Sequence, residues 1–221
     1  MTITKTEEDY LKALFYLIIE SGSDRVGTSQ VADYLDISPA SVSSMLKKLK
    51  GKDLVSYEKY KKLELTSEGK IVAVWLIRKH RLWETFLCKH MNFKWDEVHD
   101  VAEQLEHIQS PKLIRELDKF LGFPEKDPHG ARIPNQEGEY LVAPKTTLSS
   151  LSTGDRCRLV SVKDSSVAFL QHVTKIGLAL NSEIEVEDIQ EFDQSMMIHF
   201  DNKSVMISQK FADNVFVEKT V

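Results

Sequence analysis

Six side chains between residues 80 and 107, three histidines and three glutamates, have the types and the spacing of metal ligands. Four of them share one face of a predicted helix, roughly 100° wide at about 100° per residue: His99, Glu103, Glu106 and His107. His80 and Glu84 are four residues apart and share a face of the preceding predicted helix. Imidazole nitrogens and carboxylate oxygens together suit a divalent first-row metal ion. The pattern therefore favours a metal site; the alternative is a solvated acidic face, because an isolated glutamate is usually exposed.

Helices must position these side chains, and the apolar periodicity predicts them over residues 68–91, 95–108 and 111–121. The apolar side chains in this region exceed what a thin layer of helices can bury on its own, and they include Leu76, Leu82, Trp83, Phe86 and Leu87. This surplus predicts a homodimer interface.

The first 70 or so residues have the pattern of three helices followed by a strand pair. Thr6 can cap the first helix, Thr28 the second, and Pro39 stands near the first position of the third. Alternating runs at 54–57 and 63–66 predict two short strands. This is the pattern of a winged helix-turn-helix, which binds DNA in many proteins and serves as a protein-interaction module in others.

Positive charge is concentrated in this segment, although the whole chain carries a net charge of −5. Seven lysines stand against one aspartate and one glutamate from Ser41 to Leu63, the electrostatic footprint of phosphate binding. Small side chains that let base edges approach are the predicted base contacts, and nearby polar or basic ones are the predicted phosphate contacts. The first group is Ser38, Ala40, Ser41 and Ser44, and the second is Thr28, Ser29, Lys47 and Lys48. Each serine is alternatively an ordinary exposed helix residue.

The last 70 or so residues alternate repeatedly between apolar and polar side chains. Runs at 157–162, 183–187, 196–200, 204–207 and 215–217 predict short strands that form a small SH3-like β-barrel. The predicted fold class is mainly α with a small β domain. Its parts are a winged helix-turn-helix DNA-binding domain at 1–72, a helical metal-binding and dimerisation domain at 73–142, and an SH3-like domain at 148–221, with a linker-like stretch at 123–147.

Several classes of protein are disfavoured by what the sequence lacks. Cys88 and Cys157 do not have the spacing of a disulfide framework or a zinc site. No run approaches the roughly 20 apolar residues that cross a bilayer, and no secretion signal is apparent, so we expect no membrane partner and a cytoplasmic location. No HExxH, phosphate loop or recognisable nucleophile indicates an enzyme.

A di-metal carboxylate enzyme is the main alternative, but it needs Glu-x-x-His on each of two helices. A metal-independent winged-helix regulator is the second alternative.

Motifs in a fixed order run along nearly the whole chain. They are Glu8-Asp9-Tyr10-Leu11; Arg78-Lys79-His80-Arg81-Leu82 with Glu84; Val98-His99-Asp100 followed by Glu103 and Glu106-His107; and Asp127-Pro128-His129-Gly130 with Ile133-Pro134. In these the chain resembles the diphtheria toxin repressor family of iron- and manganese-dependent transcriptional repressors, in particular manganese-sensing members with a C-terminal SH3-like domain. The resemblance implies a homodimer that binds palindromic double-stranded operator DNA and represses metal-uptake genes.

The resemblance also implies two metal positions in each subunit. The primary one would use Asp9, Glu103, Glu106 and His107. The ancillary one would use His80, Glu84 and His99, with His129 the best further candidate and Asp127 and Asp164 weaker ones.

Hard ligands distinguish this chain from the iron-sensing members that it resembles. Those members have sulfur ligands at the positions of Asp9 and Glu103, so oxygen at both points favours Mn(II), with Fe(II) as the alternative. Some shorter manganese-sensing relatives have a second glutamate three residues after the aspartate. Lys12 stands there in this chain and cannot bind metal while protonated, so the two-metal arrangement of those relatives is not expected.

Asp9 belongs to the predicted DNA-binding domain, whereas Glu103, Glu106 and His107 belong to the predicted dimerisation domain. One ion bound to all four would join the two domains and set the separation of the two recognition helices. Metal is therefore expected to favour operator binding, by no more than its differential affinity for the DNA-competent arrangement.

Overall fold

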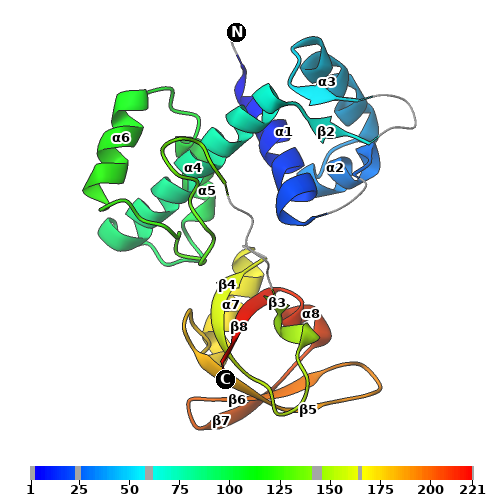
Figure 1. Ribbon diagram of the computed structural model, residues 1–221, viewed down its shortest axis with the longest axis vertical. Coiled ribbons are helices and arrows are strands. Elements are labelled where there is room, and N and C mark those ends of the chain that lie inside the picture. Colours follow the sequence, from blue (N-terminus) through cyan, green and yellow to red (C-terminus); the bar gives the residue numbers. More distant parts are fainter. Residues whose placement is uncertain (1–2, 23–25, 58–61, 141–145, 164–165, 221) are drawn as a thin grey trace. The chain divides into compact units, whose positions relative to one another are not determined.

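A computed structural model describes residues 3–22, 26–57, 62–140, 146–163 and 166–220 (Figure 1). The chain forms two compact units. The first comprises Met1–Trp83, Ala102–Glu125 and Ile133–Val142, and the second comprises Glu84–Val101, Lys126–Arg132 and Ala143–Val221.

The first unit begins with the helices and strand pair that the sequence predicts. Its elements are α1 (Lys5–Phe15), a π-helical turn η1 (Tyr16–Glu20), α2 (Thr28–Leu35), α3 (Pro39–Gly51), β1 (Val55–Ser56) and β2 (Glu64–Leu65). Antiparallel pairing sets Val55 opposite Leu65. The apolar stripes of the three helices meet in one core with Leu54, Leu63 and the start of the next helix. The winged helix-turn-helix fold is thus confirmed, and the described part of the wing includes Lys62 but not residues 58–61.

Local signals account for most of these helix ends. Ser38 caps α3 by accepting a hydrogen bond from the Ser41 amide, and Pro39 takes the first helical position. Asp36 ends α2 in the left-handed conformation at φ 52°. The prediction for α1 was wrong by two residues: Thr4 is the cap, because it forms a reciprocal capping box with Glu7.

Three further helices follow: α4 (Ser67–His90), α5 (His99–Leu105) and α6 (Pro111–Phe120). The start of α4 packs tightly on the strand pair, since a Cβ on Gly69 would lie 1.8 Å from the Leu54 carbonyl oxygen. α5 is shorter than predicted, and Glu106 and His107 lie in the turn that follows it. The Glu106 amide still donates to the Ala102 carbonyl over 2.9 Å, the hydrogen bond that an α-helix would make. The backbone at Glu106 therefore stays close to helical geometry.

The side chains expected to form a dimer interface are mostly buried within the chain. Leu76, Leu82, Trp83 and Leu87 are all buried, and Phe86 is half-buried. Other apolar side chains are exposed, namely Ile71 and Trp75 on α4 and Leu113, Phe120 and Phe123 on and after α6. The predicted surplus is therefore not found at Leu76, Leu82, Trp83 and Leu87, because their own chain covers these four side chains.

The second unit is built on a six-stranded antiparallel sheet in the order β3-β8-β4-β5-β6-β7. Its strands are β3 (Thr146–Thr147), β4 (Arg156–Val162), β5 (Glu183–Ile189), β6 (Met196–Phe200), β7 (Lys203–Ile207) and β8 (Val215–Thr220). It also contains the 3-10 turn η2 (Leu148–Ser150) and the helices α7 (Val167–Ile176) and α8 (Gln209–Ala212). All five predicted strand runs form strands, but the described strands make an open sheet rather than a closed barrel, and α7 was not predicted.

Trp95 explains why the helix expected from residue 95 begins only at His99. Its side chain packs against the core of the sheet, and its indole nitrogen donates to Thr174 Oγ1 on α7 over 3.0 Å. Tertiary contacts within the second unit thus override the local helical pattern. Among the described residues, no helix is long and apolar enough to cross a membrane.

Candidate metal centre and nucleic-acid interface

Three side chains of the first unit converge where the sequence predicts the primary metal site. Asp9 comes from α1, and Glu106 and His107 come from the turn after α5; one ligand atom from each lies within 4.8 Å of the other two. His107 Nε2 is 3.1 Å from Asp9 Oδ1 and 3.8 Å from Glu106 Oε1. These three atoms are buried, and none forms a hydrogen bond among the described residues. Two carboxylate oxygens and an imidazole nitrogen left in this way fit a divalent cation, which would satisfy all three.

The other ring nitrogen of His107 contacts a residue that was not among the predicted ligands. His107 Nδ1 lies 2.6 Å from Glu8 Oε2, and Glu8 Oε1 accepts a hydrogen bond from Gln109 Nε2 over 2.8 Å. An Nδ1–H that donates to Glu8 leaves the lone pair on Nε2, the nitrogen that faces Asp9 and Glu106. Metal-binding histidines commonly have such a carboxylate partner. The one available signal was the position of Glu8 directly before Asp9.

The pKa of Asp9 reflects its burial and the charged side chains around it. Burial raises the pKa of Asp9 above its ordinary value, Glu103 and Glu106 raise it further, and His107 opposes them. A bound cation would act in the same direction as His107 and favour the carboxylate.

Glu103, the fourth predicted primary ligand, contacts Lys12 instead of joining this group. The Lys12 ammonium is buried and donates to Glu103 Oε1, to Glu106 Oε2 over 2.7 Å, and lies 3.1 Å from His80 Nδ1. His80 Nδ1 is itself 2.5 Å from Glu106 Oε2. Glu106 therefore uses one oxygen for Lys12 and His80 and presents the other to Asp9 and His107. Lys12 places its ammonium between two glutamates that would otherwise repel each other.

A second group of possible ligands lies in the second unit and consists of Glu84, Asp127 and His129, all buried and with one atom each within 4.8 Å of the others. Glu84 Oε2 is 3.6 Å from His129 Nδ1, and Glu84 Oε1 is 3.6 Å from His99 Nδ1. His129 Nε2 lies 2.8 Å from the Trp95 carbonyl, which directs Nδ1 towards Glu84. Burial lowers the pKa of His129, but Glu84, Asp127 and the Trp95 carbonyl together raise it to about 9.

The loop that carries Asp127 and His129 is fixed against β4. Asp127 Oδ1 accepts hydrogen bonds from the amides of His129 and Ala131, and the His129 carbonyl accepts one from the Val162 amide. A Cβ on Gly130 would lie 2.1 Å from the Val160 carbonyl oxygen, so only glycine fits, at φ +81°. Of the predicted ancillary residues, Glu84, His99 and His129 lie here together with Asp127. His80 contacts Glu106 and Lys12 in the first unit, and Asp164 lies outside the described residues.

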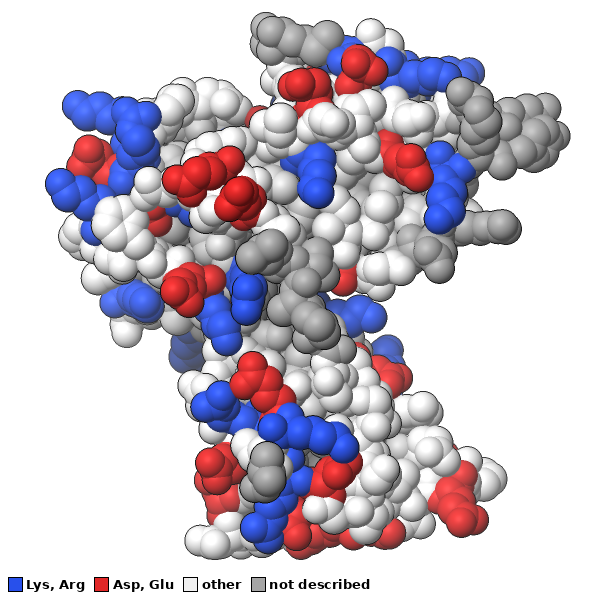
Figure 2. Space-filling view, in the orientation of Figure 1, with Lys and Arg blue, Asp and Glu red and all other residues white. Residues whose placement is uncertain are grey.

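The predicted DNA-contacting side chains gather on the exposed side of α3 and at the start of α2. All are exposed except Thr28, which is half-buried: Ser29, Ser38, Ala40, Ser41, Ser44, Lys47 and Lys48. Figure 2 shows Lys or Arg side chains along the outer edge of α3. Ser38 also has a structural role as the helix cap, and its hydroxyl lies 2.9 Å from that of Ser41.

Glu7, on α1, connects α1 to α3. Its buried carboxylate lies 2.8 Å from Lys52 Nζ and 3.3 Å from Lys48 Nζ, both at the end of α3, while also binding the Thr4 amide. Burial would raise the pKa of Glu7, but these partners outweigh it and lower the pKa to about 2. α1 therefore carries Asp9 and Glu8 towards the predicted metal ligands and Glu7 towards the lysines at the end of α3.

A winged helix whose first helix provides a candidate metal ligand defines a class: metal-responsive DNA-binding regulators. Comparison with known proteins agrees. Residues 2–63 match the iron dependent repressor N-terminal DNA binding domain, 66–135 the iron dependent repressor metal binding and dimerisation domain, and 146–219 the FeoA domain.

Individual relatives point the same way. The HTH-type transcriptional regulator MntR of Bacillus subtilis (strain 168) is 34% identical over 124 residues, which cover 56% of this chain and 85% of that protein. The iron-dependent repressor IdeR of Mycobacterium bovis is 33% identical over 132 residues, 60% of this chain and 56% of that protein. A solved manganese-dependent transcriptional repressor in complex with manganese has a TM-score of 0.90 at 32% identity and covers 97% of this chain and 100% of its own. The manganese regulator SloR has a TM-score of 0.82 at 34% identity, with 100% of both chains covered.

The chain belongs to the diphtheria toxin repressor family of iron- and manganese-dependent repressors. The resemblance seen in the sequence motifs is thereby confirmed. The protein is a metal-dependent transcriptional repressor and not an enzyme, which removes the di-metal enzyme alternative.

Proposed function

We propose that this repressor responds to Mn(II) and binds palindromic operator DNA as a homodimer. The observation that carries the proposal is the convergence of Asp9 Oδ1, Glu106 Oε1 and His107 Nε2, three buried atoms without hydrogen bonds. Asp9 comes from the DNA-binding part of the chain, and the other two come from the part that matches a metal binding and dimerisation domain.

Side chains of α1 connect the candidate metal ligands to α3, the helix predicted to contact DNA. Asp9 and Glu106 repel each other, and a bound divalent ion supplies the charge that holds them together with His107. Glu7 on the same helix is paired with Lys52 and Lys48 of α3. The position of α1 therefore determines the position of α3, and metal favours operator binding to the extent that it favours one position of α1.

The donor set favours manganese over iron. Asp9, Glu106 and His107 offer two oxygens and one nitrogen without sulfur, and Glu103, the remaining predicted ligand, adds another oxygen. Later first-row metals gain affinity from soft sulfur ligands, and a site with hard oxygen ligands does not offer that gain. Such a site suits Mn(II). The manganese-dependent repressor and the manganese regulator SloR, among the similar solved structures, support the same assignment, with Fe(II) as the alternative.

A second ion position is proposed at Glu84, Asp127 and His129, with His99 at its edge. All three are buried, and the loop that carries Asp127 and His129 is fixed on β4, which limits how far the site can adapt. Its role would be to stabilise the second unit when metal is present. Substitution Glu84→Gln should lower the number of ions bound per chain by one, without removing metal-dependent DNA binding.

An operator-binding assay tests the main proposal. Fluorescence anisotropy of labelled DNA from upstream of the protein's own gene should show tight binding of the protein with Mn(II) and weak binding with a chelator. Asp9→Ala should abolish the difference while light scattering still reports a dimer, and Asp33→Ala, an exposed aspartate of α2, should behave as wild type. Metal-activated binding that survives Asp9→Ala would contradict the proposal, as would binding that ignores the chelator.

A further inference from the structure

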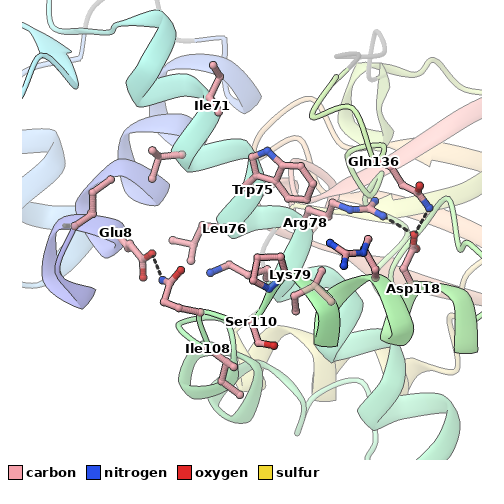
Figure 3. A pocket seen from close by; sticks show the side chains of 16 residues that line it. Glu8, Ile71, Trp75, Leu76, Arg78, Lys79, Ile108, Ser110, Asp118 and Gln136 are labelled. Atoms are coloured by element: carbon pink, nitrogen blue, oxygen red, sulfur yellow. Dashed lines mark hydrogen bonds and ion pairs between the residues drawn. The ribbon is translucent and has the colours of Figure 1, made fainter. Parts of the chain in front are cut away.

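A pocket of 680 Å³ lies in the first unit between α1, α4 and α6, apart from the two groups of metal ligands. Figure 3 shows Glu8 at one end and Asp118 with Gln136 at the other, with Trp75, Leu76 and Lys79 between them. Most of its wall is apolar. Its volume falls within the range typical of small-molecule sites.

The polar groups at the two ends of the pocket already have partners. Asp118 Oδ2 accepts hydrogen bonds from Arg78 and Gln136, both over distances below 3 Å. Glu8 pairs with His107 and Gln109. Neither end therefore needs a ligand.

Lys79 differs from these groups. Its side chain is 92% buried (8% exposed) and lines the middle of the pocket, yet no hydrogen bond or ion pair joins its ammonium to any residue in the described part of the chain. The negative charges that act on it are Glu8 and Glu106, and both carboxylates are hydrogen-bonded to other side chains. A buried ammonium without a partner is costly and is stabilised by an anion.

The wall next to Lys79 determines what kind of anion fits. Ile71, Trp75 and Leu76 line the pocket on α4, and Ile114 lines it on α6. A small hydrated anion would leave these apolar surfaces in water, whereas an anion with an apolar chain would cover them. A single buried ammonium matches a single negative charge better than a phosphate dianion. Arg115 also lines the pocket, but it is exposed, so water meets its charge and it does not require a second negative charge on the ligand.

We propose that this pocket binds a medium-chain aliphatic monocarboxylate, whose carboxylate pairs with Lys79 and whose chain lies against Ile71, Trp75 and Leu76. The pocket would make the repressor a receptor for a second kind of molecule besides its metal. Because Glu8 lines the pocket and holds His107, the ligand would lie one side chain away from the metal group.

Calorimetric titration of the full chain with decanoate, below its micelle-forming concentration, tests this proposal. We expect one site per chain with a dissociation constant below about 1 mM. Lys79→Met should weaken binding at least about tenfold, because it keeps the apolar stem and removes the charge. Lys70→Met, an exposed lysine of the same helix outside the pocket, should bind as wild type.

A second measurement does not depend on any variant. Decan-1-ol has the same chain without the charge and should bind wild-type protein at least about tenfold more weakly than decanoate. Thermal unfolding would check that Lys79→Met is folded. No binding of decanoate up to 1 mM, equal binding by Lys79→Met, or equal affinity for decan-1-ol would each overturn the proposal.

Discussion

Lys12 is the side chain whose replacement should reveal most about the metal-free state. Its ammonium lies between Glu103 and Glu106 and beside His80. Lys12→Met keeps a similar apolar stem but removes the ammonium that contacts both glutamates. We expect a large loss of stability in the absence of metal.

The two ion pairs of Lys12 should contribute unequally. Glu106 is fully buried and its Oε2 is 2.7 Å from the ammonium, whereas the Glu103 side chain is 37% exposed. Charges at the Glu106 distance attract by about 6 kcal/mol at an effective dielectric constant near 20, but the cost of desolvating both ions offsets much of this. Removing one partner of a buried pair typically costs about 3–5 kcal/mol, and a partly exposed pair adds about 1 kcal/mol or less. The expected loss is therefore about 3–5 kcal/mol, most of it from Glu106.

Urea unfolding with a chelator present would measure the free energy of unfolding directly. Lys70→Met, an exposed lysine of α4, is the matched control and should change stability by no more than about 0.5 kcal/mol. Added Mn(II) should stabilise Lys12→Met more than wild type, since the bound ion then supplies the missing positive charge. A loss below about 1 kcal/mol, or an equal effect of Mn(II) on both proteins, would refute this account of Lys12.

Three further predictions concern neighbouring glutamates. Glu8→Gln replaces the charged partner of His107 and should weaken Mn(II) binding about 10- to 100-fold by calorimetry; an unchanged affinity would mean that the Glu8 contact does not orient the ring. Glu7 has its pKa lowered to about 2 from an ordinary 4.5, so its contribution to stability is complete above pH 4.5 and is lost as the pH falls towards 2. Glu7→Gln should therefore flatten the pH dependence of the free energy of unfolding in that range, and an unaltered slope would contradict the assignment. Glu103→Cys adds a soft ligand and should shift the preference from Mn(II) towards Fe(II) in competition binding; an unchanged preference would show that hard ligands do not set selectivity.

Sequence patterns alone predicted the architecture of this repressor well where the signal is local. The winged helix follows from apolar periodicity and from Pro39, and the strands of the second unit follow from alternation. α7 was missed because its residues, between two strand runs, carry no sharp start signal apart from Ser166. The helix predicted over residues 95–108 was too long at its start, because Trp95 packs on the core of the sheet. That contact cannot be predicted from a local sequence pattern.

The candidate metal site divides in the same way. Residue types and helical spacing determined that His99, Glu103, Glu106 and His107 could bind metal, and the motif around Asp9 added the ligand from α1. Only the tertiary structure decided which of them meet: Glu106 and His107 turn towards Asp9, while Glu103 faces Lys12, 91 residues away in sequence. The physical reason is that spacing fixes the direction of a side chain on its own helix, but the charge that it faces is supplied by another helix. Glu8 behind His107 and Lys79 in its apolar pocket became visible only in that context.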